Sequence, residues 1–172
     1  MNVAFIPVRG GSKSIPLKNI KPMCGKPLVY WTVAAACGCK NIDKVYVATD
    51  SEKIRETLQN VKDTDTDGRL DKMEIIGRSQ ESASDTASTE FAMLEFAREH
   101  LFDHIVLIQA TSPLLTAEDL DRGFALYEQK ETDSVLSVVR QKRFNWKVEK
   151  DGSAQTTITF IVRDDRNLKD IV

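Results

Sequence analysis

The stretch that decides the fold is a short apolar segment that runs into a basic, glycine-containing turn near the amino end. It reads Phe5-Ile6-Pro7-Val8-Arg9-Gly10-Gly11-Ser12-Lys13-Ser14-Ile15-Pro16-Leu17-Lys18-Asn19. The apolar run from 3 to 8 has the length and composition of a buried strand. The two glycines that follow allow a close backbone approach to a ligand, and N–H groups in such a turn can form an anion-binding concavity. The sequence therefore predicts a strand followed by a phosphate-binding turn.

The cations of this turn indicate the kind of anion. Arg9 offers a planar fork that suits phosphate, and Lys13 and Lys18 add point charges. In open α/β sheets ligands bind at the carboxyl ends of the strands, which is where this turn lies. The turn fits neither Gly-x4-Gly-Lys-Ser/Thr nor Gly-x-Gly-x-x-Gly. On these residues alone, the alternative is a surface turn whose cations face water.

Strand and helix patterns alternate along most of the chain. Apolar, β-branched runs predict strands and amphipathic or apolar runs with capping residues predict helices. The expected strands are 2–8, 45–48, 74–76, 105–108, 134–139 and 156–162, and the expected helices are 28–36, 52–58, 89–97 and 117–130. This alternation predicts an α/β fold, a Rossmann-like, mostly parallel sheet with helices on both faces.

Length and composition limit the classes of function. The 172 residues suit a single domain, with 41% hydrophobic and 29% charged residues. The net charge of −2 argues against nucleic acid or an anionic membrane as a partner. With no apolar run of 18 residues and no signal-peptide pattern, we expect a cytoplasmic protein. The three cysteines, Cys24, Cys37 and Cys39, are then reduced thiols.

Two further polar segments follow predicted strands, and parallel strands end at one edge of the sheet. The first, 78–85, contains an arginine and several hydroxyls, which can contact a base edge or a ribose; the alternative is a capped helix entry with an exposed Arg78. The second, 108–114, carries Gln109, Thr111 and Ser112. These side chains would project into the same crevice as the glycine turn, unless the segment is a turn built on Pro113.

The segment 63–74 has the spacing of a calcium loop. It satisfies Asp-x-Asp-x-Asp-Gly-x5-Glu, with Asp63, Asp65, Asp67 and Glu74 as the candidate ligands. A calcium hand also needs a helix on each side, and Gly77 would break the exiting helix. The favoured interpretation is a solvated acidic turn that precedes a strand.

The pattern Arg-Gly-Gly-Ser-Lys-x-Ile-Pro-x-Lys-Asn of residues 9–19 resembles the signature of the acylneuraminate cytidylyltransferases, or CMP-sialic acid synthetases. These enzymes have the nucleotide-diphospho-sugar transferase type of fold. Residues 108–114 resemble the same family, and the likeness covers about 1–148, whereas the tail 149–172 does not match clearly. The resemblance implies that 1–172 is a single cytidylyltransferase-like domain.

The resemblance also implies a reaction, in which CMP passes from CTP to the anomeric hydroxyl of a sialic acid and pyrophosphate is released. Mg²⁺ is the implied cofactor, and a homodimer is implied if a dimerisation segment exists. The residues that the resemblance assigns are Arg9 and Lys18 for catalysis; Arg9, Gly10, Gly11, Ser12, Lys18, Asn19, Arg78 and Ser82 for CTP; and Gln109, Thr111, Ser112 and Lys147 for the sugar.

Several alternatives remain open on the sequence. Related Kdo cytidylyltransferases carry an aspartate where this chain has Gln109, which favours a nonulosonate such as sialic, pseudaminic or legionaminic acid. The family holds its metal with a late pair of aspartates, and Asp164, Asp165 and Asp170 do not stand in that context. A non-catalytic nucleotide-binding domain is therefore the second interpretation.

Overall fold

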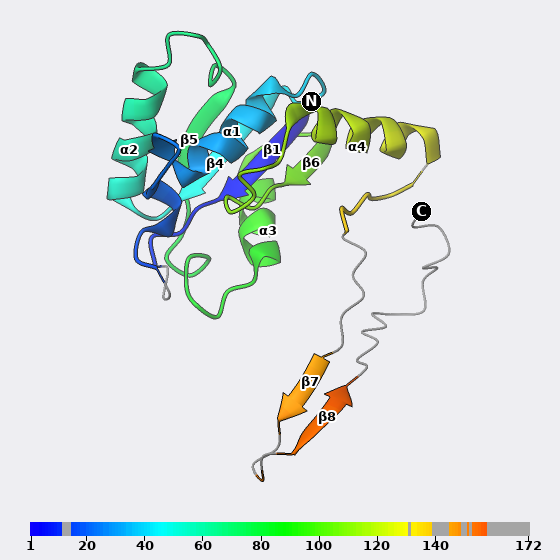
Figure 1. The fold of residues 1–172 in the computed structure, drawn as a ribbon. Helices are drawn as coiled ribbons and strands as arrows, with labels where there is room; N and C mark the ends of the chain where they lie inside the picture. Colours follow the sequence, from blue (N-terminus) through cyan, green and yellow to red (C-terminus); the bar gives the residue numbers. More distant parts are fainter. Residues whose placement is uncertain (12–14, 131, 139–144, 149–150, 152, 158–172) are drawn as a thin grey trace. The chain divides into compact units, whose positions relative to one another are not determined.

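The computed structural model describes residues 1–11, 15–130, 132–138, 145–148, 151 and 153–157. By its internal contacts the chain forms two units, Met1–Val135 and Leu136–Val172. The second unit contains an antiparallel hairpin of β7 (Asn145–Val148) and β8 (Ala154–Thr157). The first unit carries the sheet and the four α-helices described below (Figure 1).

The sheet of the first unit contains β1 (Asn2–Pro7), β4 (Lys44–Thr49), β5 (Met73–Gly77) and β6 (His104–Leu107). Its order is β5-β4-β1-β6, and all three pairings are parallel. Phe5 of β1 lies opposite Tyr46 on one side and Leu107 on the other. The predicted parallel α/β sheet is therefore confirmed.

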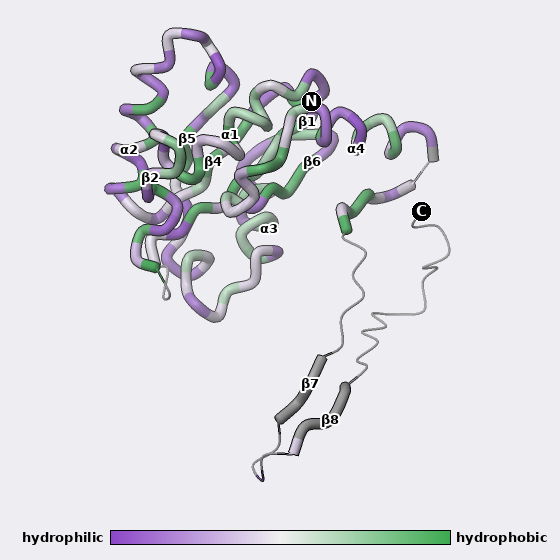
Figure 2. Tube along the Cα trace, in the orientation of Figure 1, coloured by the Kyte–Doolittle hydropathy of each residue, from purple (hydrophilic) through white to green (hydrophobic). Residues whose placement is uncertain are grey.

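Side chains of the two central strands alternate between two cores, as the strand period of two requires. Ile6, Val45 and Val47 face a core formed with α1 (Leu28–Gly38), α2 (Glu52–Asp63) and α4 (Ala117–Lys130). Phe5 and Tyr46 face a second core formed with α3 (Thr89–Glu99). Helices thus cover both faces of the sheet, as predicted, and Figure 2 shows the hydrophobic residues concentrated in the strands between them.

Three of the described helices, α2, α3 and α4, begin at a polar capping side chain. Ser51 accepts from the Ile54 N–H at 3.5 Å, and Ser88 accepts from the Phe91 N–H at 3.1 Å. Thr116 and Asp119 accept from each other's N–H at 3.2 and 3.1 Å, so that two donors of the first turn of α4 are satisfied. These caps fix where the strand ends give way to helices, and therefore where the intervening loops stand.

Between β1 and α1 the chain makes two tight turns. Leu17 has φ 51° and ψ 33°, a left-handed conformation that few non-glycine residues adopt, and it precedes the short 3-10 helix η1 (Lys18–Ile20). A hairpin of β2 (Pro22–Met23) and β3 (Lys26–Pro27) follows, and its two-residue turn has φ 51° at Cys24 and 80° at Gly25. Two positive φ values in succession are typical of hairpin turns whose twist matches the strands.

Two sequence-based expectations need correction. Residues 134–138 do not form the predicted strand, and residue 139 lies outside the described residues. Val135, Leu136 and Val138 are 42%, 75% and 60% exposed. Strand propensity misleads here because β-branched residues form a strand when their backbone finds a ladder partner, and no described strand pairs with this run. The strand predicted at 156–162 begins earlier, at Ala154, and its remainder lies outside the described residues.

The candidate calcium loop lies between a helix and a strand. Asp63 ends α2, and Met73 begins β5, so a strand stands where the exiting helix of a calcium hand would be. The favoured interpretation, an acidic turn ahead of a strand, agrees with the fold.

None of the described helices has the length and apolar character needed to cross a membrane.

Candidate functional site

A pocket of about 340 Å³ lies at the carboxyl ends of β1 and β6. The order of the strands reverses between these two neighbours, and such a reversal opens the crevice in which α/β sheets bind ligands. The lining comes from four segments, namely the end of β1, η1, the loop between β5 and α3, and the residues after β6. The described lining residues are Pro7, Arg9, Lys18, Asn19, Arg78, Ser82, Ser84, Asp85, Ala87, Ser88, Thr89, Gln109, Ala110 and Thr111.

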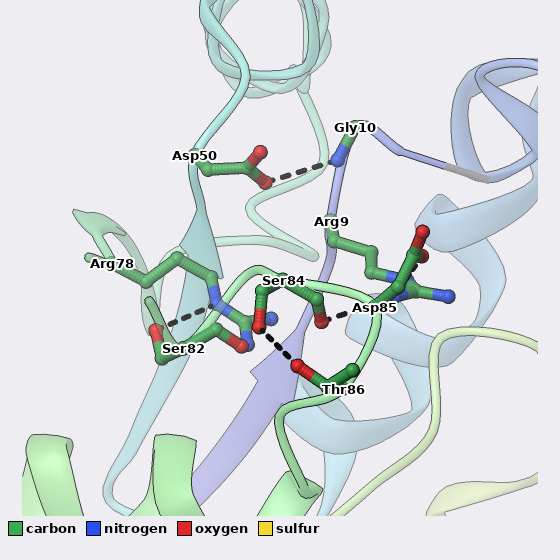
Figure 3. A network of polar contacts seen from close by, with 8 residues as sticks. All are labelled: Arg9, Gly10, Asp50, Arg78, Ser82, Ser84, Asp85 and Thr86. Atoms are coloured by element: carbon green, nitrogen blue, oxygen red, sulfur yellow. Dashed lines mark hydrogen bonds and ion pairs between the residues drawn. The ribbon is translucent and has the colours of Figure 1, made fainter. Parts of the chain in front are cut away.

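The glycine turn is held against the neighbouring strand by a carboxylate. The Gly10 N–H donates to Asp50 Oδ1 at 3.0 Å (Figure 3). A Cβ at Gly10 would stand 2.9 Å from Ser51 Cβ, so the close approach of this turn to the residues after β4 requires glycine. A Cβ at Gly11 would meet nothing within 4 Å. In this structure the Gly10 N–H is thus bonded to Asp50, and the contact of Gly10 and Gly11 with CTP stays a prediction. Ser12 lies outside the described residues.

Arg9 points into a contact with the loop that precedes α3. Its Nη1 donates to Asp85 Oδ1 at 3.0 Å and to the Ser84 carbonyl oxygen at 3.4 Å (Figure 3). Both side chains of this ion pair are about two-fifths exposed. The contact therefore orients the guanidinium at the pocket while leaving part of it open to solvent.

Lys18 and Asn19 line the pocket from η1, immediately after the left-handed Leu17. Asn19 is only 8% exposed, and its side-chain oxygen has no hydrogen-bond partner among the described contacts. A buried acceptor without a donor costs free energy, on the order of 1–3 kcal/mol. A ligand that donates a hydrogen bond to Asn19 Oδ1 would remove this cost.

Arg78 and Ser82 form the back of the pocket. Arg78 Nε donates to Ser82 Oγ at 3.3 Å, and the guanidinium also donates to the Ser82 carbonyl oxygen (Figure 3). Ser82 is 2% exposed. Burial lowers the pKa of Arg78, and the nearby charges of Asp50 and Glu95 act in the opposite direction. The buried serine thus fixes a half-buried cation.

The residues after β6 make a neutral wall. Gln109 and Thr111 line the pocket, and no described contact gives either side chain a hydrogen-bond partner in the protein. Ser112 does not belong to the described lining; its N–H donates to the Gln109 carbonyl oxygen at 3.1 Å and closes the turn. Lys147 belongs to β7 in the second unit, so its part in sugar binding stays a prediction.

Three residues of the site were missed by sequence reasoning. They are Asp50, Asp85 and Ser88, none of which the sequence patterns single out as a binding residue. A usable signal was present, since Asp50 directly follows a predicted parallel strand and must lie at the same sheet edge as Arg9. The pairing of Arg9 with Asp85, 76 residues away, could not be found from spacing.

The described residues contain no cluster of three or more potential metal-binding side chains. Within the candidate calcium loop, each carboxylate has another contact. Asp63 accepts from Gln59 at 2.7 Å, Asp65 from the Leu70 N–H at 2.7 Å, and Glu74 from Lys44 at 2.7 Å, while Asp67 lies 3.4 Å from Arg69. The structure does not bring the four together, so the calcium candidate is not supported.

A parallel sheet with a cationic pocket at its switch point defines an α/β protein of the nucleotide-binding kind. Comparison with known proteins gives the family. A family model described as Cytidylyltransferase matches residues 3–161, and the chain belongs to this family.

Relatives of established name agree with this assignment. The chain is 40% identical over 155 residues to N-acylneuraminate cytidylyltransferase A of Danio rerio, which covers 89% of this chain and 34% of the relative. It is 32% identical over 132 residues to a pseudaminic acid cytidylyltransferase of Campylobacter jejuni, which covers 76% of this chain and 55% of that protein. The chain thus spans between a third and about half the length of these relatives.

Solved structures agree on the fold. A CMP:2-keto-3-deoxy-manno-octonic acid synthetase complexed with CTP superposes with a TM-score of 0.63 at 20% identity, over 76% of this chain and 48% of that one. A 4-diphosphocytidyl-2C-methyl-D-erythritol synthase from Anaerococcus prevotii gives 0.61 at 11% identity, over 92% of this chain and 63% of that one. At these identities the likeness concerns the fold alone.

Proposed function

We propose that the protein transfers CMP from CTP to the anomeric hydroxyl of a sialic acid or a related nonulosonate, with release of pyrophosphate. The observation that carries the proposal is the convergence of three cations, Arg9, Lys18 and Arg78, on one pocket with the unpartnered acceptor Asn19. The names of the relatives, which act on N-acylneuraminate or pseudaminic acid, support the same class of acceptor.

The residues that line the pocket fall into two groups, one suited to the triphosphate of a nucleotide and one to its nucleoside. Its volume of about 340 Å³ lies within the usual range for ligand pockets. We assign Arg9 and Lys18 to the triphosphate, because a guanidinium fork and an ammonium both bind phosphate oxygens. We assign Arg78, Ser82 and Asn19 to the nucleoside, where hydroxyl and amide groups can meet a base edge or a ribose.

The sugar would lie against the neutral wall. Gln109 and Thr111 have polar groups without protein partners among the described contacts, and they stand at the end of β6 beside the end of β1. An amide and a hydroxyl can donate to and accept from the hydroxyl and acyl groups of a nonulosonate. Ser112 and Lys147 remain proposed contacts of the sugar.

The reaction then needs little covalent help from the protein. The anomeric hydroxyl oxygen attacks the α-phosphorus and forms the new O–P bond, while its proton passes to water. The bond from the α-phosphorus to the bridging oxygen of the β-phosphate breaks, and pyrophosphate leaves. Arg9 and Lys18 would stabilise the negative charge that develops on the leaving group, and the two walls would hold the reacting atoms in line.

Mg²⁺ belongs to the proposal as the metal that neutralises phosphate charge. The described residues do not assemble a site for it, because Asp50 and Asp85 are held by Gly10 and Arg9 and no cluster forms elsewhere among them. No step above therefore passes through the metal. A homodimer and a cytoplasmic location complete the proposal; the location is supported by three cysteines that are all free thiols.

The test is release of pyrophosphate from CTP, with Mg²⁺ and a panel of N-acetylneuraminate, pseudaminate, legionaminate and Kdo as acceptors. We expect release that depends on a nonulosonate, and little with Kdo. Release with Kdo alone would contradict the assignment of Gln109.

The second candidate is a nucleotide-binding domain without turnover, which needs the cationic pocket but no metal site. Titration calorimetry with CTP measures whether the pocket binds nucleotide at all, which both candidates require. CTP binding without pyrophosphate release would support the second candidate, and no CTP binding would contradict both.

A further inference from the structure

Arg78 stands between two cavities. It lines the pocket at the sheet edge, and it also lines a second hollow of about 540 Å³ between α3 and the sheet. A side chain with open space on both sides is not fixed by packing. Its direction must instead be set by hydrogen bonds and by nearby charges.

The hydrogen bonds that hold Arg78 come from a turn built around Ser79. Two hydrogen bonds to Ser79 hold Ser82 in place. The Ser82 N–H donates to Ser79 Oγ at 3.0 Å, and the Ser82 hydroxyl donates to the Ser79 carbonyl oxygen at 3.1 Å. The Ala83 N–H donates to the same carbonyl at 3.0 Å. Arg78 in turn donates to Ser82, so the guanidinium is placed correctly only while the turn keeps its shape.

One side chain from outside the turn anchors it. Glu95, in the middle of α3, accepts from the Ser79 N–H with both oxygens, at 3.2 and 3.5 Å. Burial would raise the pKa of Glu95, but hydrogen bonds from Ser82 and Ser79 and the charge of Arg78 outweigh it and lower the pKa. The carboxylate is therefore ionised at neutral pH, and its charge attracts Arg78 as well.

We propose that Glu95 is a positioning residue of the nucleotide site, which holds the 78–82 turn from α3 and thereby aims Arg78 at the nucleoside end of the ligand. The inference rests on the proposed function, because it concerns the same pocket. It differs from a general structural role in one respect. Loss of Glu95 should weaken recognition of the nucleoside and spare that of the phosphates, which we assign to the lining residues Arg9 and Lys18.

The experiment compares Glu95→Ala and Glu95→Gln with Glu99→Ala. Glu99 lies one turn further along α3 and lines the second hollow, so its variant is the matched control. Glutamine keeps the acceptor oxygen and nearly the size of glutamate, which preserves the fold if alanine does not. The probes are CTP and inorganic triphosphate, both titrated by calorimetry into the full chain, with thermal unfolding measured for every variant.

We expect Glu95→Ala to bind CTP about tenfold more weakly, the usual effect of losing a hydrogen bond to a charged group. Glu95→Gln should bind CTP within about threefold of the wild type, since the acceptor remains. Inorganic triphosphate should bind all three variants and the wild type alike, and Glu99→Ala should match the wild type for both probes.

The results that overturn the inference are distinct from those that overturn the function. Wild-type CTP affinity in Glu95→Ala, or an equal loss for CTP and triphosphate, would show that Glu95 does not aim Arg78. Failure of the wild-type protein to bind CTP would contradict the proposed function, and the role of Glu95 with it.

Discussion

The pocket has two walls that differ in how the protein holds them. The charged wall consists of Arg9, Lys18 and Arg78, and two of these cations have fixed partners, Asp85 for Arg9 and Ser82 for Arg78. The neutral wall consists of Gln109 and Thr111, whose side chains have no hydrogen-bond partner in the described contacts. In the charged wall, Arg9 and Arg78 are held by protein contacts before a ligand binds. In the neutral wall, the described polar groups of Gln109 and Thr111 are free to bond a ligand.

This difference indicates that the two walls have different roles in binding. Groups fixed in advance meet a ligand without reorganisation, which suits the proposed CTP, because its phosphates and its nucleoside are the same whatever the acceptor. Free amide and hydroxyl groups can adapt to the pattern of a sugar, at the cost of ordering their rotamers. We infer that the charged wall sets affinity for the nucleotide and that the neutral wall sets the choice of acceptor.

The largest expected effect comes from removing the cation at the centre of the charged wall. Arg9→Ala should abolish CTP binding, a loss of about a hundredfold or more, because bidentate phosphate contacts are among the stronger hydrogen bonds. Titration calorimetry measures it, with Lys21→Ala, a cation outside the described lining, as the control. Unchanged CTP affinity in Arg9→Ala would contradict the claim that the charged wall sets the affinity for nucleotide.

The next effect comes from the backbone of the same wall. Gly10→Ala would place a Cβ 2.9 Å from Ser51 Cβ and push the turn away from β4. We expect CTP affinity to fall about tenfold and the free energy of unfolding to fall by about 1–3 kcal/mol. Gly11→Ala, where a Cβ meets nothing within 4 Å, is the matched control. Equal effects in the two variants would mean that the close approach at Gly10 is unimportant.

The neutral wall should behave in the opposite way. Gln109→Ala should leave CTP affinity within about twofold of the wild type and weaken sugar binding to the CTP-loaded protein about tenfold. Calorimetry with CTP and then with the preferred acceptor measures the two affinities, and Gln59→Ala, on α2 and outside the described lining, serves as the control. A loss of CTP affinity in Gln109→Ala would show that the two walls are not separate in function.

The smallest effect on ligands is expected from a carboxylate remote from both walls. Asp121 of α4 accepts from the Lys40 N–H at 3.0 Å, from Asn41 Nδ2 at 2.9 Å and from Cys39 Sγ at 3.1 Å. The bond from Cys39 is the main cause that lowers the pKa of Asp121. Asp121→Asn should leave CTP affinity unchanged and reduce the free energy of unfolding by about 1 kcal/mol at pH 7.

The pH dependence of this variant follows from the sign of the pKa shift. A carboxylate whose pKa is lowered by folding stabilises the folded state above its unfolded pKa of about 4, and loses that effect as the pH falls through the folded value. Urea unfolding of both proteins between pH 7 and pH 3 should therefore show the difference shrinking below about pH 4. A difference that grows with acid would contradict the assignment.

Much of this arrangement could be predicted from the sequence, because it follows from local patterns. The apolar runs around Phe5 and Tyr46 indicated buried parallel strands, and the edge rule for parallel sheets placed Arg9 and Gln109 in one crevice before any geometry was known. The helix expected at 117–130 agrees with the bounds of α4, Ala117–Lys130.

The rest depends on pairings that no local pattern contains. The partners of Gly10 and Arg9 are Asp50 and Asp85, 40 and 76 residues away, and a carboxylate in a polar loop gives no sign of which cation it will meet. The run 134–138 was mistaken for a strand for the related reason that propensity describes a residue and not its ladder partner.

The pairing of β1 with β6 has a consequence for the order in which the chain folds during synthesis. Asn2 and His104 are 102 residues apart in the chain, so the crevice between these strands is assembled by one of the most distant contacts of the first unit. Contacts of such separation close slowly and add their stabilisation last. In a nascent chain β1, β4 and β5 can therefore pair early, whereas the pocket at the ends of β1 and β6 forms only after β6 has left the ribosome.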